Sequence, residues 1–146
     1  NHCTPILVLN KWDLLNEEEK LNINSSLSSH LKKYNWIKVI RISALTKKGL
    51  EKFSKTITEI YLQLDTRINT SDLNLYFREL WVSSPPHPFR GRRAKLKYVT
   101  QYDTNPPSFS FNLSSRIPKN YESFIENKIR KEFKFNNVSI MIKFKN

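Results

Sequence analysis

The sequence has 146 residues, enough for one ordinary domain or for two small ones, and 38% of them are hydrophobic. Its single cysteine, Cys3, excludes a disulfide framework and a cysteine-based zinc site, and is typical of a reducing cytosol. No apolar run is long enough to span a bilayer, so we expect no membrane anchor and no membrane partner.

The positive charge of the chain is concentrated in its second half. The formal net charge is +12 at pH 7. Residues 1–66 carry ten basic and seven acidic side chains, whereas residues 67–146 carry fifteen and six. Such a basic segment is typical of proteins with an anionic partner, so we expect nucleic-acid contacts in the second half. A basic surface that only aids solubility is the alternative.

The first predicted strand, residues 6–9, consists of four consecutive apolar residues, which is typical of a strand buried on both faces of a parallel sheet. It is followed at once by Asn10, Lys11 and Asp13. Ligands of open α/β sheets bind at the carboxyl ends of the strands. There the Asp13 carboxylate can accept two parallel hydrogen bonds from guanine, which adenine does not offer. The alternative is a strand-to-helix turn with an Asx cap.

A second predicted strand, residues 37–42, runs directly into Ser43, Ala44 and Leu45. In guanine-nucleotide proteins the backbone N–H groups of such a Ser-Ala-x turn donate to the guanine O6 atom. A strand, Asn-Lys-x-Asp, a helix and a strand that ends in Ser-Ala-Leu follow one another in the order expected for the last third of a GTPase domain. The two segments together therefore predict a guanine pocket.

Hydrophobic periodicity predicts the remaining elements. We expect helices over about residues 17–34, 50–64, 70–82 and 118–134, and strands over 95–102, 108–113 and 138–144. The second half then reads helix, strand, strand, helix, strand, an α+β order compatible with a KH-like domain. Because Gly49 and Gly91 are the two glycines of the chain, there is no GXXG loop of the kind that clamps RNA in KH domains.

Basic residues gather just before and within the first strand of the second half. They are Arg90, Arg92, Arg93, Lys95 and Lys97. The outer face of the last predicted helix is also basic, through Lys128, Arg130, Lys131 and Lys134. We expect any contact with RNA phosphates to use one of these two surfaces.

Five separated segments carry a resemblance to a known family. They are Asn10–Asp13, Ser43–Leu45, Arg90–Gln101, Pro106–Phe109 and Tyr121–Arg130. In this order they resemble the Der (EngA) family, bacterial GTPases with two tandem Era-like GTPase domains followed by a KH-like domain. The resemblance covers nearly the whole chain. One departure is Asn136-Asn137-Val138, where the family usually has Gly-x-Pro.

The resemblance implies an α/β partial P-loop GTPase domain with a parallel sheet in residues 1–66 and an α+β KH-like domain in residues 67–146. It implies GTP or GDP as ligand, with Asn10 and Asp13 reading guanine, Lys11 stacking along the base, and Ser43, Ala44 and Leu45 closing the pocket. It also implies a role in ribosome biogenesis, in the bacterial cytoplasm or a plastid stroma. The partners would be the large ribosomal subunit, its rRNA and upstream GTPase domains.

The sequence lacks the parts that hold nucleotide phosphates. It contains neither a Gly-x-x-x-x-Gly-Lys-Ser/Thr loop nor an Asp-x-x-Gly, so we expect no ligand of Mg²⁺ and no catalytic residue in it. Because the first strand follows so closely on Asn1, which is not Met, we expect a longer parent protein. The alternative is a stand-alone basic KH-like module that binds RNA without nucleotide chemistry.

Overall fold

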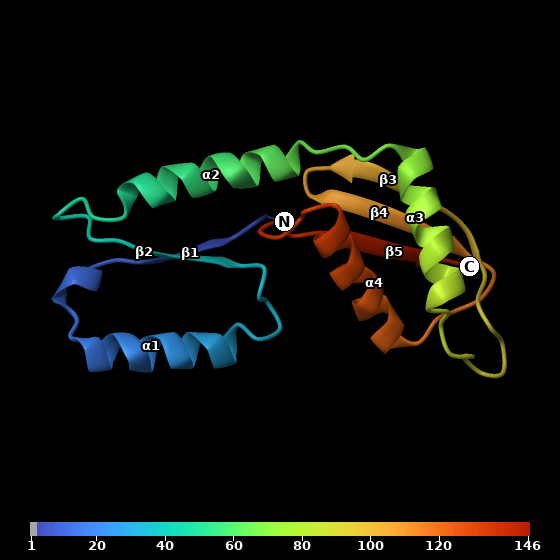
Figure 1. Ribbon diagram of the computed structural model, residues 1–146, viewed down its shortest axis with the longest axis horizontal. Helices are drawn as coiled ribbons and strands as arrows, with labels where there is room; N and C mark the ends of the chain where they lie inside the picture. The colour runs from blue at the N-terminus through green and yellow to red at the C-terminus, as the bar shows by residue number, and fades with distance from the viewer. Residues whose placement is uncertain (1–2) are drawn as a thin grey trace. The chain divides into compact units, whose positions relative to one another are not determined.

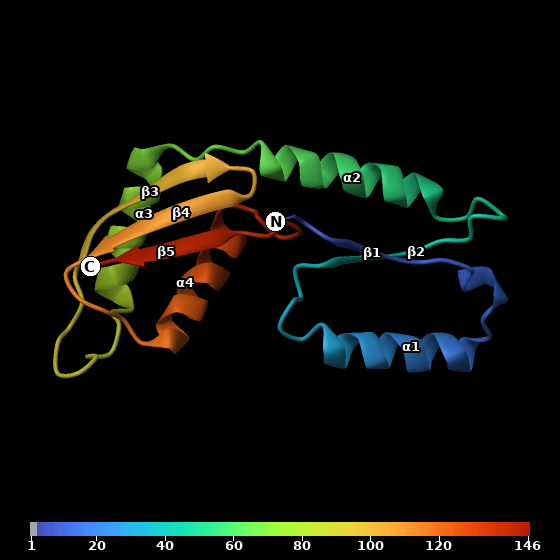
Figure 2. The same cartoon turned by 180° about the vertical axis from the view of Figure 1, so that it is seen from behind.

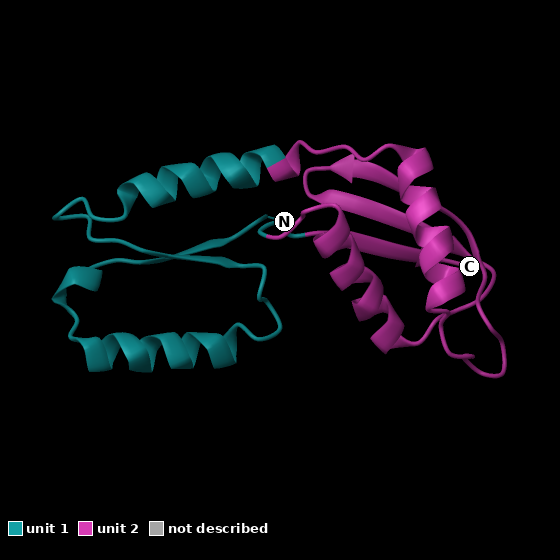
Figure 3. Cartoon of the chain, in the orientation of Figure 1, with its two compact units in different colours: residues 1–62, 137–139 teal, residues 63–136, 140–146 magenta. Residues whose placement is uncertain are grey.

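The structure is a computed structural model that describes residues 3–146 (Figure 1). The chain forms two compact units, each with its own β-sheet (Figure 3). The first unit comprises the residues up to 62 together with 137–139, and the second comprises residues 63–136 and 140–146. Within the described range, no helix has the length and apolar character needed to cross a membrane.

The first unit is built around a two-stranded parallel sheet. Strand β1 (Ile6–Leu9) pairs with β2 (Lys38–Arg41), and α1 (Glu17–His30) connects them. Helix α2 (Leu50–Leu64) follows β2, and the two helices lie on opposite sides of the strands (Figures 1 and 2). Because the strands run in the same direction, the segments that follow them emerge at the same end of the sheet.

Helix α1 begins with a capping box formed by Asn16 and Glu19. The Asn16 Oδ1 atom accepts a hydrogen bond from the Glu19 N–H at 2.9 Å, and Glu19 Oε2 accepts one from the Asn16 N–H at 2.8 Å. The helix ends at His30, earlier than the predicted end near Tyr34. The reason is a turn in which the Tyr34 N–H donates to the Leu31 carbonyl, three residues back, at 2.8 Å.

The second unit is a three-stranded sheet with both of its helices on one face. Strand β3 (Leu96–Thr104) pairs antiparallel with β4 (Pro107–Leu113), and β4 pairs parallel with β5 (Met141–Lys145). Helices α3 (Thr70–Ser83) and α4 (Lys119–Glu132) cover one face, and Figure 2 looks onto the other. The predicted order of elements is confirmed, although β5 begins later than expected.

The core of the second unit consists largely of aromatic rings. Phe109 and Phe111 of β4 are fully buried, and Ser108 and Ser110, whose side chains alternate with them along the strand, are buried as well. Phe77 of α3 meets Phe111 edge-to-face, with 4.8 Å between the ring centroids. This contact packs α3 against the sheet.

The prediction that Arg130 lies on the basic outer face of the last helix was wrong. Its side chain is buried, with Nη2 at 2.9 Å from Glu126 Oε1 and Nη1 donating to the Phe135 carbonyl at 3.1 Å. Burial lowers the pKa of Arg130, while the hydrogen bond and charge of Glu126 act in the opposite direction. Arg130 therefore anchors the end of α4 and does not face a ligand.

Candidate functional site

The two segments predicted to recognise guanine lie side by side in the first unit. The Trp12 N–H donates to the Ile42 carbonyl at 3.0 Å. The Asn10 Oδ1 atom accepts hydrogen bonds from the Ala44 N–H at 3.0 Å and from the Lys11 N–H at 2.8 Å. The side chain of Asn10 thus ties the loop after β1 to the loop after β2.

A sharp turn at Lys11 separates Asn10 from Asp13. Lys11 has φ 61° and ψ 29°, a left-handed conformation that costs roughly 1–2 kcal/mol for a residue with a Cβ atom. Asp13 lies in the short 3-10 helix Trp12–Leu14, labelled η1, and is exposed. Within residues 3–146 its carboxylate has no hydrogen-bond or ion-pair partner, so both oxygens are free to accept from a ligand.

Three backbone N–H groups of the loop after β2 are engaged within the protein. Ser43 is buried, its N–H donates to the Lys48 carbonyl at 2.9 Å, and its Oγ accepts from the Thr46 N–H at 3.2 Å. The Ala44 N–H is engaged as described above. In the described part of the chain, the N–H groups of Leu45, Lys47, Lys48 and Gly49 have no hydrogen-bond acceptor, and the Leu45 side chain is 89% exposed. The Leu45 N–H, which follows directly on the Ala44 amide that is bound to Asn10, is therefore a backbone donor available to a ligand.

Gly49 fixes the path of this loop against β2. It has φ 82°, and a Cβ atom there would collide with the Arg41 carbonyl oxygen, so only glycine fits without a backbone shift. The Arg41 guanidinium lies over the Trp12 ring, 5.2 Å from its centroid, and donates to Asn24 Oδ1. Gly49 therefore constrains the loop after β2, and the Arg41 side chain links the end of β2 to Trp12 and to Asn24 of α1.

The basic segment of the second unit begins with a tight hairpin turn. The Phe89 N–H donates to the Arg92 carbonyl at 2.9 Å, and the Arg92 N–H donates to the Phe89 carbonyl at 3.1 Å. The two central residues, Arg90 and Gly91, have φ 50° and 74°. Positive φ at both central positions is the mark of a type I′ turn, in which glycine is unstrained and arginine is not.

Two side chains from the helices hold the chain on either side of residues 85–93, which contain this turn. Trp81 Nε1 of α3 donates to the Ala94 carbonyl at 3.0 Å, and the Tyr121 hydroxyl of α4 donates to the Ser84 carbonyl at 2.6 Å. Burial raises the pKa of Tyr121 to about 12, so the phenol keeps its proton for this bond. The two rings meet edge-to-face at 5.2 Å. The basic segment is therefore positioned by the fold.

The structure divides the predicted basic residues into two groups. Arg90 and Arg92 line a cavity of about 540 Å³, whereas Arg93, Lys95 and Lys97 are exposed and do not line it. The same cavity is lined by Arg116, from the loop after β4, which the sequence prediction missed. Arg116 follows two serines and precedes an apolar residue, so no local sequence pattern marks it as a binding residue. Only the cavity that it shares with Arg90 and Arg92 indicates such a role.

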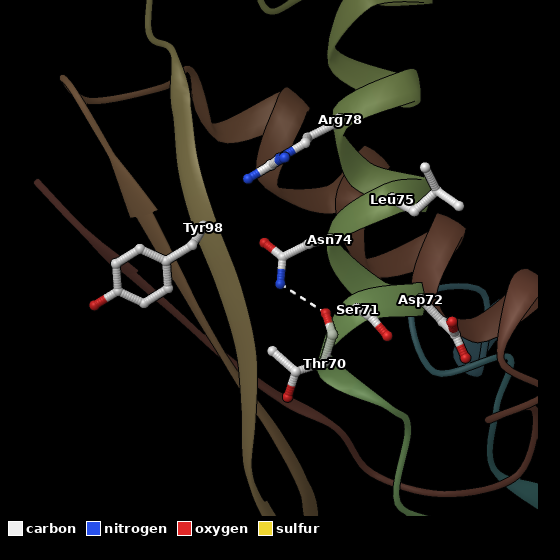
Figure 4. A pocket seen from close by; sticks show the side chains of 7 residues that line it. All are labelled: Thr70, Ser71, Asp72, Asn74, Leu75, Arg78 and Tyr98. Atoms are coloured by element: carbon white, nitrogen blue, oxygen red, sulfur yellow. Dashed lines mark hydrogen bonds between the residues drawn. The ribbon is translucent and has the colours of Figure 1, made fainter.

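A separate groove of about 570 Å³ lies between α3 and β3 (Figure 4). Asn74 of α3 accepts from the Val99 N–H at 2.9 Å and donates to the Val99 carbonyl at 2.8 Å. It thus satisfies the free edge of β3 much as a neighbouring strand would. Arg78 lines this groove, while the ring of Tyr98 points away from α3. None of the predicted site residues lines it.

Comparison with known proteins identifies the family. A family model described as the KH-domain-like of EngA bacterial GTPase enzymes, C-terminal, matches residues 67–145. The chain belongs to the Der (EngA) family. This confirms the resemblance carried by the five sequence segments, and the KH-like fold of the second unit with it.

Curated Der relatives match almost the whole chain. GTPase Der of Chlorobium limicola is 36% identical over 143 residues, which are 95% of this chain and 33% of that protein. GTPase Der of Lawsonia intracellularis is 32% identical over 142 residues, covering 96% and 31%. GTPase Der of Corynebacterium glutamicum is 30% identical over 137 residues, covering 94% and 26%. The chain thus spans between about a quarter and a third of the length of these Der proteins.

Proposed function

We propose that the chain works as the C-terminal part of a GTP-binding, GTP-hydrolysing Der protein in assembly of the large ribosomal subunit. In this proposal residues 1–66 are the C-terminal part of an Era-like P-loop GTPase domain, and residues 67–146 form a KH-like domain that contacts rRNA. The protein acts in the bacterial cytoplasm or a plastid stroma. The observation that carries the proposal is the 3.0 Å hydrogen bond from Ala44 to Asn10, which joins the two guanine-recognition segments.

Each residue of the candidate guanine site has a separate task. The unpartnered Asp13 carboxylate accepts hydrogen bonds from the N1–H and amino group of guanine. The Leu45 N–H donates to guanine O6, because the Ala44 amide already serves Asn10. The aliphatic stem of Lys11 lies along the base. Adenine presents neither the paired donors nor the O6 acceptor, so it leaves Asp13 and the loop amide unpaired.

Exposed apolar side chains support the proposal that this unit packs against further GTPase-domain structure. Val8 of β1 is 37% exposed, Leu21 of α1 is 69% exposed, and Ile57 of α2 is 45% exposed. Strands of parallel sheets are normally covered on both faces and paired on both edges. Upstream strands and helices of a GTPase domain would cover these surfaces.

The residues present do not fit the Mg²⁺ ion and phosphate groups that accompany GTP. Among residues 3–146 no cluster of three or more His, Cys, Asp or Glu side chains could hold a metal ion. The sequence also contains no glycine-rich phosphate loop. The chain therefore supplies base recognition, and we assign no step of phosphoryl transfer to its residues.

The 146-residue chain is accordingly expected not to hydrolyse GTP by itself. Positioning of the phosphates and neutralisation of their charge provide almost all of the catalysis in such enzymes. The measurement is phosphate release from GTP by the purified chain, compared with the Asp13→Ala variant to subtract contaminating activity. Turnover by the unmodified chain clearly above that of the variant would contradict this part of the proposal.

A further inference from the structure

The cavity lined by Arg90, Arg92 and Arg116 brings three guanidinium groups together from two separate loops. The loops are tied by a pair of hydrogen bonds: the Lys95 N–H donates to Ser114 Oγ at 2.8 Å, and the Ser114 N–H donates to the Lys95 carbonyl at 2.9 Å. Like charges that line one cavity repel each other, and an anion bound in the cavity relieves this repulsion.

No carboxylate side chain of the described residues neutralises this cluster. The cavity has no acidic side chain in its wall, and within residues 3–146 none of the three arginines forms an ion pair. Glu122 lines an adjoining cavity and is not within ion-pair distance of Arg116. No side chain of the described residues therefore balances the positive charge at this cavity, which is also lined by Asn146, the last residue of the sequence; such an arrangement favours an anionic ligand.

The wall of the cavity also contains a hydroxyl group that lacks a partner. Ser115 Oγ is buried and has no hydrogen-bond partner among the described residues, a situation that costs free energy in a folded protein. Because this oxygen is shielded from solvent, it supports the wall of the cavity and does not itself face a ligand. Arg90 gives a sign of function, because it is held in a left-handed conformation that arginine disfavours.

We propose that Arg90, Arg92 and Arg116 form a pocket for a phosphate group of the RNA backbone. The proposal rests on the RNA-binding part of the proposed function and names the place where one phosphodiester is held. A guanidinium group binds phosphate oxygens through two parallel N–H donors, which favours arginine over lysine at such a site. Because the turn that contains Arg90 is already held in place by the fold, its guanidinium group needs little further ordering when a ligand binds.

The test uses the 146-residue chain and a fluorescent uridine oligonucleotide of about a dozen nucleotides, with anisotropy measured at several salt concentrations. Arg116→Gln is expected to weaken binding about fivefold and to reduce the slope of log K against log salt by about one. Arg78→Gln is the matched control. It removes the same charge from an exposed position of the same unit, in the groove of Figure 4, and should leave affinity within about twofold.

Equal effects of Arg116→Gln and Arg78→Gln would overturn the pocket, while leaving RNA binding by the basic segment intact. Arg92→Gln provides a second variant of the pocket and should match Arg116→Gln. Both replaced side chains are exposed, so folding is expected to be unaffected, and circular dichroism checks this.

Competition with inorganic phosphate shows whether the pocket takes a phosphate group of the RNA backbone or free phosphate. If free phosphate at about millimolar concentration displaces the oligonucleotide from the unmodified chain but not from Arg116→Gln, free phosphate and the RNA backbone compete for the pocket, which supports the assignment. If the unmodified chain binds free phosphate, Arg116→Gln does not, and the oligonucleotide is not displaced, the pocket is a site for free phosphate and the assignment to the RNA backbone is wrong. An unmodified chain that does not bind the oligonucleotide at low salt would contradict the RNA-binding part of the proposed function as well.

Discussion

Replacing Phe77 by alanine is expected to lower the free energy of unfolding of the second unit by about 3–5 kcal/mol. The ring is fully buried and packs edge-to-face on Phe111 of β4, with 4.8 Å between the centroids, and also contacts Phe133, at 6.5 Å. Its loss leaves a cavity at the point where α3, β4 and the end of α4 meet. Small domains have about 5–15 kcal/mol in total, so much of the stability would be lost. Urea denaturation followed by circular dichroism measures the change.

Leu75→Ala is the matched control for this experiment. Leu75 lies on the same helix but is 62% exposed, so its truncation should change the free energy of unfolding by no more than about 0.5 kcal/mol. If Phe77→Ala cost as little as Leu75→Ala, the packing of α3 on the sheet described here would be wrong.

Asp13→Asn is expected to reduce the GTP affinity of the intact parent protein by about 100-fold or more, and to favour xanthosine triphosphate instead. The carboxylate offers two acceptors to the two donors of guanine, and within residues 3–146 it has no competing partner. An asparagine replaces one acceptor by an N–H₂ donor, which faces the guanine amino group unfavourably but matches the carbonyl group of xanthine. Direct titration with both nucleotides measures the change in preference.

Glu17→Gln is a suitable control, because Glu17 lies shortly after Asp13 and forms an exposed ion pair with Lys20, at 2.7 Å. Exposed pairs of this kind contribute at most about 1 kcal/mol, and this one is not part of the proposed site. Its replacement should leave the affinity for GTP unchanged. An Asp13→Asn protein with unchanged GTP affinity would contradict the assignment of Asp13.

Local sequence signals predicted the elements because each has a short-range physical cause. The capping box at Asn16 needs only two side chains and three peptide units, and alternation along β4 follows from the geometry of one strand. The meeting of the Asn10 and Ser43 loops could also be predicted, since parallel strands bring their carboxyl ends to the same edge of a sheet.

Features that depend on tertiary contacts could not be predicted in this way. Arg116 joins Arg90 and Arg92 only because two loops are tied at the end of the sheet. The burial of Arg130 depends on the chain turning back after α4, so that a carbonyl group meets the guanidinium. Similarly, the Ala44 amide donates to Asn10 only because the loops after β1 and β2 lie next to each other in the fold. This contact leaves the Leu45 amide for a ligand.

The most direct test of the proposed function is to isolate the native protein from its source, and to determine its intact mass and its bound nucleotide together. The account predicts a mass several-fold above the 17.4 kDa of this chain, with guanine nucleotide bound. A mass near 17.4 kDa without nucleotide would contradict it. The protein would then be a small basic RNA-binding module, and the guanine-recognition roles of Asn10 and Asp13 would have to be abandoned.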